Sequence, residues 1–98
     1  MNVNVQSIKF DADKKLIDFV EKKASKLDKF FDGIIGTDVF LRLDNQSMDN
    51  KKVEIRLNIP GNDLFAERSS KSFEESVDLC VDALKIQLQK AKEKMRGV

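Results

Sequence analysis

The stretch KVEIRLNIPGNDLFAERS, residues 52–69, decides the fold because two alternating segments flank a turn. In its first part, residues 52–59, every second residue is apolar and the residues between are charged or polar. Since successive side chains of a strand point to opposite faces, this pattern predicts a strand with one buried and one solvated face. PGND, which starts at Pro60, is turn-like in composition, and LFAERS predicts a shorter strand over 64–69.

Two earlier segments show the same alternation. DVFLRLD, residues 38–44, predicts a strand before the one at residues 52–59, and NQSMDN, residues 45–50, predicts the turn between these two strands. Near the start of the chain, NVNVQSI, residues 2–8, predicts a further half-buried strand through Val3 and Val5. The sequence therefore predicts four strands in all.

Two other segments carry apolar residues at helical spacing. Asp13 stands where an N-cap belongs and predicts a helix that continues to Phe31 and ends at Asp32-Gly33. Ser72 has capping-box spacing to Glu75 and predicts the start of a long final helix. The apolar residues are Leu16, Val20, Ala24, Leu27 and Phe31 in the first helix, and residues 73, 77, 80, 81, 84, 88, 91 and 95 in the final one.

The elements follow one another in the order β-α-β-β-β-α, which predicts an α+β fold. With a right-handed first crossover, both helices cover one face of a four-stranded sheet and leave the other face open to solvent. This arrangement is double-stranded-RNA-binding-domain-like. We expect a single domain over residues 1–98.

The composition excludes several kinds of chemistry. Histidine is absent, which removes histidine acid/base catalysis and histidine metal sites, and no glycine-rich phosphate loop occurs. The single cysteine, Cys80, lies on an apolar helical stripe and is predicted to be a buried, inert thiol. We expect no enzyme, no metal and no cofactor. MNVNVQSIKF does not resemble a signal peptide and no segment has the length of a membrane span, so we expect a cytoplasmic protein without membrane contact.

The charged residues are segregated although the formal net charge is only +1. In the first helix, lysines at spacings of 7, 4 and 3 fall opposite the apolar residues, with Lys23 on the border. In the final helix, acids occupy the first turns and bases the last. The basic residues are Lys15, Lys22, Lys26 and Lys29 in the first helix, and Lys85, Lys92 and Arg96 with Lys90 and Lys94 in the final one.

This pattern has two interpretations. Solvated helix faces are charged in any case, and acids at a helix start with bases at its end are what the helix dipole favours. Alternatively, the two lysine-bearing helices form a joint basic surface for RNA phosphates, which lysines bind as point charges.

The open face of the sheet offers a second candidate surface. Its candidate contact residues are Phe40, Arg42, Arg56 and Phe65. The two aromatic rings could stack on nucleobases, or pack against each other as a cross-strand pair or under a loop. The mixed charges suit a protein partner as well as RNA, so a protein-interaction or homodimerisation module is the alternative function.

Three segments, KLDKFFDGI (26–34), NDLFAERSSKSFEESVDLCVDAL (62–84) and LKIQLQKAKEK (84–94), together with the element order, resemble a known family. The chain resembles the ribosome hibernation-promoting factor and ribosome-associated inhibitor family, also described as ribosomal subunit interface or sigma-factor modulation proteins, in its short form. It departs from many members at Glu74, where an aromatic residue is common, and at Ala83, where a lysine is common.

The resemblance implies a non-enzymatic translation inhibitor. Such a protein binds the small ribosomal subunit in the mRNA channel and the A and P tRNA sites, and its basic helix residues contact ribosomal RNA. By position these are Lys22, Lys23, Lys26 and Lys29, with Lys90 and its neighbours Lys85, Lys92 and Lys94. The resemblance leaves open a second, ribosome-dimerising factor and a weak homodimer. Binding to free double-stranded RNA is a third idea, for which a dedicated basic loop is lacking.

Overall fold

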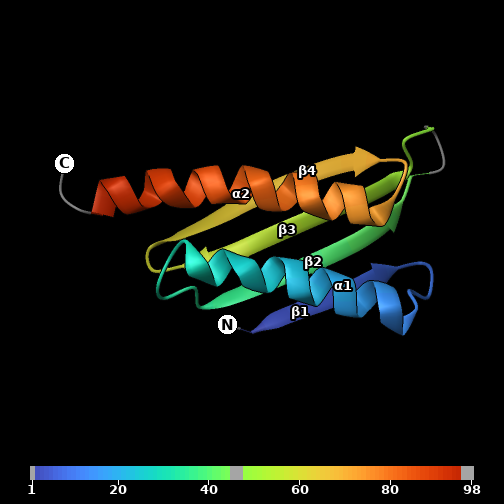
Figure 1. The fold of residues 1–98 in the computed structure, drawn as a ribbon, viewed down its shortest axis with the longest axis horizontal. Helices are drawn as coiled ribbons and strands as arrows, with labels where there is room; N and C mark the ends of the chain where they lie inside the picture. Colours follow the sequence, from blue (N-terminus) through green and yellow to red (C-terminus); the bar gives the residue numbers. More distant parts are fainter. Residues whose placement is uncertain (1, 45–47, 96–98) are drawn as a thin grey trace.

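The computed structural model of the protein describes residues 2–44 and 48–95, with Met95 described in backbone only. The predicted order β-α-β-β-β-α is confirmed, and so is the α+β class (Figure 1). A short 3₁₀ helix, η1, follows the first α-helix. The elements are β1 (Val3–Ile8), α1 (Lys14–Ser25), η1 (Lys26–Lys29), β2 (Gly36–Leu43), β3 (Lys51–Ile59), β4 (Asn62–Ser70) and α2 (Phe73–Met95).

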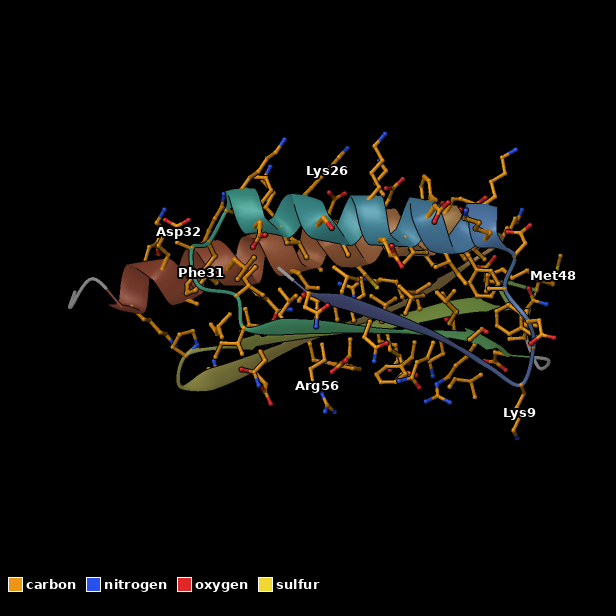
Figure 2. All side chains as sticks on the ribbon, turned by 90° about the horizontal axis from the view of Figure 1, so that it is seen from below. Lys9, Lys26, Phe31, Asp32, Met48 and Arg56 are labelled. Atoms are coloured by element: carbon orange, nitrogen blue, oxygen red, sulfur yellow. The ribbon has the colours of Figure 1, made fainter. Side chains whose placement is uncertain are left out.

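The strands form one mixed sheet in the order β1-β2-β3-β4. β1 pairs with β2 in parallel, whereas the other two pairings are antiparallel. Parallel neighbours need a crossover connection, and α1 with η1 supplies it. Figure 1 shows α1 and α2 side by side across the sheet, and Figure 2 shows both helices on the same face, as predicted.

The core lies between this helix layer and the sheet. The predicted alternation of β3 is confirmed, because Val53, Ile55 and Leu57 are fully buried while Arg56 and Asn58 are exposed. The buried residues of the helix layer in this core are Val20, Ala24, Leu27, Phe73, Val77, Cys80, Leu84 and Leu88, and Phe31 joins them from the segment after η1.

The first helix begins as predicted but does not continue as an α-helix. The Asp13 carboxylate accepts a hydrogen bond from the Leu16 N–H at 2.8 Å, which is an N-cap contact. The α-helical part ends at Ser25, so the predicted continuation to Phe31 is wrong. Tighter 3₁₀ turns are common at helix ends, and here the Phe30 N–H donates to the Leu27 carbonyl at 3.0 Å.

The tightening decides which of two adjacent phenylalanines enters the core. Leu27 and Phe31 are buried, whereas Phe30 is half-buried beside α2. Helical structure ends at Lys29, so the predicted end at Asp32-Gly33 is wrong by a few residues. Gly33 turns the chain after it, with a φ of 94° that favours glycine.

The final helix is anchored by a serine network. The Ser72 hydroxyl accepts the Glu75 N–H at 3.1 Å, so the predicted cap is formed. The return bond of a capping box is replaced, because the Ser72 N–H donates to the Ser70 hydroxyl at 3.4 Å. The Ser70 and Ser76 hydroxyls lie 2.7 Å apart, and Ser76 donates to the Lys51 carbonyl at 2.6 Å. These bonds tie the start of α2 to β3 and β4.

The connection between β3 and β4 is tighter than predicted. Asn62 and Asp63 already pair with Ile59 and Asn58, so the turn consists of Pro60 and Gly61 alone. Gly61 has a φ of 78°, which the turn requires. The turn predicted at NQSMDN falls partly on residues 45–47, which lie outside the described residues.

The Cys80 thiol is fully buried, as predicted. Its S–H donates to the Val53 carbonyl at 3.4 Å. Burial raises the pKa of the thiol to about 12, because the core disfavours the thiolate. The group therefore stays protonated at physiological pH.

This burial predicts a pH-dependent stability. Because the folded pKa of Cys80 lies above the ordinary value of 9.0, the unfolded chain loses the thiol proton first as the pH rises. Between pH 8 and 10.5, the wild-type free energy of unfolding should fall by about 2 kcal/mol more than that of Cys80→Ala. Urea unfolding followed by circular dichroism measures both, and equal losses would contradict the burial of the thiol.

Candidate nucleic-acid interface

A groove of about 500 Å³ runs between the first helical segment and the middle of α2. One wall comes from the end of α1, η1 and the residue after it, and the other wall from α2. The lining carries more positive than negative side chains, which favours an anionic ligand. The lining residues are Lys23, Lys26, Lys29, Phe30, Asp78, Val81, Asp82 and Lys85.

Lys23 bridges the two walls. Its ammonium lies 3.2 Å from the Asp78 carboxylate and 5.6 Å from the centre of the Phe19 ring. Both charged side chains are partly exposed, so the ion pair contributes at most about 1 kcal/mol to stability. The contact neutralises Asp78 inside the groove. The sequence predicts Lys23 on the border of the basic face, and in the structure its ammonium contacts Asp78 and Phe19 of the protein itself.

Lys85 lies against an aromatic ring from the opposite wall. Its ammonium is 4.7 Å from the centre of the Phe30 ring, within cation–π distance. Phe30 is half-buried and reaches this position because η1 turns it away from the core. The contact places a positive charge directly over an apolar surface.

The predicted basic residues are gathered only in part. Lys23, Lys26, Lys29 and Lys85 meet at the groove. Lys22 and Lys92 are exposed outside it, and Figure 2 shows Lys26 pointing away from the sheet.

Three further predicted lysines line other hollows. Lys15 lies at the start of α1 in a hollow shared with Phe10 and Glu74. Lys90 and Lys94 lie beside the start of β4. The predicted joint basic surface is therefore distributed along the helix layer, with its densest part at the groove. Arg96 lies outside the described residues.

The open sheet face has most of its charges paired. Arg42 donates to Glu54, and the Lys52 ammonium lies 2.8 Å from the Glu67 carboxylate. The hydrogen bond to Glu67 raises the pKa of Lys52. Arg56 is exposed and points away from the helices (Figure 2).

Phe40 and Phe65 both lie on the open face, as predicted, but they do not form a cross-strand pair. Phe40 lies opposite Glu54 of β3, whereas Phe65 lies opposite Arg56, so β3 separates the two rings. Phe65 is 46% exposed and Phe40 is half-buried. A single exposed ring remains on this face rather than an aromatic platform.

Among residues 2–44 and 48–95, no group of three or more acidic or cysteine side chains is placed to hold a metal ion. Within the same residues, no helix has the length and apolar character needed to cross a membrane.

The chain is therefore a small α+β protein in which two helices cover one face of a four-stranded mixed sheet and a lysine-lined groove lies between the helices. Residues 3–96 match the family described as Sigma 54 modulation protein / S30EA ribosomal protein. The chain belongs to this family, that of the ribosome hibernation promoting factors, which are non-enzymatic. The expectation drawn from the resemblance is confirmed at the level of the family.

Individual relatives agree with this assignment. The chain is 32% identical over 94 residues to the ribosome hibernation promoting factor of Azotobacter vinelandii, covering 96% of this chain and 85% of that protein. It is 28% identical to the ribosome hibernation promotion factor of Bacillus subtilis, of which it covers only 50%.

Solved structures show the same fold. The N-terminal domain of Thermus thermophilus Protein Y superposes with a TM-score of 0.80 at 26% identity, covering 92% of this chain and 98% of that one. A ribosomal subunit interface protein from Coxiella burnetii superposes with a TM-score of 0.84 at 24% identity, covering 95% and 99%. At that identity, the second comparison supports the fold alone.

The sequence did not reveal the groove as a site. The sequence does not single out Phe30 as a site residue, and it assigns Val81 to the apolar stripe of the final helix. Asp78 and Asp82 were counted among acids that favour a helix start. Their convergence depends on how the two helices pack, and no local pattern of residues records it.

The geometry predicts that the groove lysines are dispensable for folding. Lys26 is exposed, and its repulsion by neighbouring lysines is offset by its favourable place at a helix end. Lys26→Gln should therefore change the free energy of unfolding by less than about 0.5 kcal/mol. Leu27→Ala, at the adjacent fully buried position, should lower it by about 2–5 kcal/mol. Urea denaturation measures both free energies of unfolding. Similar losses in the two variants would contradict the prediction that Lys26 is dispensable for folding.

Proposed function

We propose that this protein silences translation by occupying the mRNA channel and the A and P tRNA sites of the small ribosomal subunit. The observation that carries this proposal is the gathering of exposed lysines over the boundary between the two helices, on the face opposite the open sheet. Membership of the hibernation factor family supports the ribosome as the partner. The protein acts in the cytoplasm, where its partner is found.

The contact is made with phosphates of ribosomal RNA. Lysine ammonium groups are flexible point charges that bind phosphate without reading base sequence, and RNA carries such phosphates densely. The proposed contact residues form the basic layer: Lys22, Lys23, Lys26 and Lys29 from the first helical segment, and Lys85, Lys90, Lys92 and Lys94 from α2, with Lys15 at the margin.

Inhibition of this kind needs no catalytic step. A domain held over the channel by several charge contacts excludes mRNA and tRNA by volume. Because each contact releases counterions from the RNA, the affinity should fall steeply as salt rises. Release of the ribosome then requires only dissociation.

A second candidate function uses the open sheet face for a protein partner or a second copy of the chain. It is favoured by the exposed Phe65 ring beside charges that are already paired within the face. Light scattering distinguishes the two functions. A tight dimer that persists at high salt and does not bind ribosomes would favour the second function, in which the sheet face binds a protein.

Reversal of charge on the helix layer is expected to abolish ribosome binding. The test variant carries Lys22→Glu, Lys26→Glu, Lys85→Glu and Lys92→Glu, all at exposed positions. Its affinity for small subunits, measured by cosedimentation at about 0.1 M salt, should fall by roughly 100-fold or more, because several phosphate contacts become repulsive.

A matched control separates position from net charge. Lys9→Glu, Arg56→Glu, Arg68→Glu and Lys71→Glu make the same change in charge at exposed positions off the helix layer. We expect this variant to retain most of its binding. Equal losses in the two variants, or no loss in the first, would contradict the proposed contact surface.

A further inference from the structure

We infer that the groove between η1 and α2 is a subsite for one unpaired nucleotide of RNA. The base would lie against Phe30, the phosphate on Lys26 and Lys29, and Asp82 would accept a hydrogen bond from an amino group of the base. The inference rests on the proposed function and deepens it, because it adds recognition of a base to a surface otherwise suited to phosphates alone.

The groove has the size and openness of a site for one nucleotide. Its volume of about 500 Å³ lies within the range of small-ligand sites. A base that is stacked inside a duplex cannot enter such a space, whereas an unpaired base can be turned outward and inserted. The occupant is therefore a nucleotide of a single strand or a loop.

The apolar part of the groove suits the ring of a base. Phe30 and Val81 contribute from opposite walls, and both are half-buried. The Lys85 ammonium, 4.7 Å from the ring centre, holds the place that a base would take. Because the lysine stem is long and flexible, a stacked base can displace the ammonium toward the phosphate of the same nucleotide.

The acidic part of the groove is unusual for a phosphate site. Lys23 neutralises Asp78, but among the residues that the structure describes Asp82 has no hydrogen-bond or ion-pair partner. A free carboxylate repels phosphate, and a hydrogen bond donated by the ligand to the carboxylate would offset this repulsion. Carboxylates accept such bonds from the amino group of cytosine, and uracil lacks that group.

Two oligonucleotides of equal charge test this arrangement. Fluorescence anisotropy at about 0.1 M salt compares labelled twelve-nucleotide RNAs of cytidine only and of uridine only. The wild-type protein should bind the cytidine strand about five-fold more tightly, as expected for a hydrogen bond to a charged acceptor that is partly exposed. Equal affinities would overturn the inference.

Removal of the Asp82 carboxylate distinguishes recognition of the base from simple repulsion of phosphate. Asp82→Ala should abolish the cytidine preference. The matched variant Glu93→Ala, which removes an exposed acid of α2 outside the groove, should retain it. If Asp82 acted only as a repulsive charge, both variants would bind both strands more tightly and keep the same preference, which would overturn the role of Asp82.

Phe30→Leu tests the stacking contact while keeping an apolar side chain. It should weaken binding of the cytidine strand by about ten-fold and leave binding of a twelve-base-pair RNA duplex unchanged. The control is Phe19→Leu. Like Phe30, Phe19 lies beneath a lysine, in this case Lys23 of its own helix α1, but Phe19 does not line the groove. Circular dichroism verifies that both variants fold, and equal effects of the two would overturn the assignment.

Two further measurements separate this inference from the proposed function. Free cytidine monophosphate that competes as well as the strand would overturn the RNA subsite in favour of a free-nucleotide site. Wild-type protein that cosediments with small subunits but shows no cytidine preference would overturn the subsite alone. Protein that shows the preference but does not cosediment would overturn the proposed function alone.

Discussion

The parallel pairing of β1 with β2 is the constraint on which the rest of the structure depends. Parallel neighbours cannot be joined by a hairpin, so the chain must cross the sheet between them. The crossover lays α1 and η1 on the face that α2 also covers (Figure 2). Both helices bury one side against the same strands, and the groove with its lysines forms where their remaining sides meet.

The two faces differ in how their basic side chains are held. On the sheet face, Arg42 and Lys52 are held by carboxylates of neighbouring strands, so little free positive charge remains there. On the helix face, Lys22, Lys26 and Lys29 lie exposed, and Lys23 forms an ion pair with Asp78 of the neighbouring helix. The lysines of the helix layer are thereby grouped around the groove and along the C-terminal part of α2, although the chain as a whole is nearly neutral.

Local patterns were sufficient for most of the fold. Alternation predicted the strands, and the caps at Asp13 and Ser72 predicted where the helices begin. The change to a 3₁₀ helix at Lys26 was not predictable, because both geometries bury Leu27 and the choice depends on the fit of Phe31 in the core. The groove was less predictable still, since Phe30 and Lys85 meet only through the packing of the two helices.

We expect the helix layer, not the sheet face, to contact the ribosome. Acetylation of lysines in the presence and absence of small subunits, read out by mass spectrometry, tests it most directly. If the helix layer binds the ribosome, Lys22, Lys26, Lys29 and Lys85 become protected while Lys9 and Lys71 stay reactive. Protection of Lys9 and of Lys52 on the sheet, with unchanged reactivity along the helices, would contradict it.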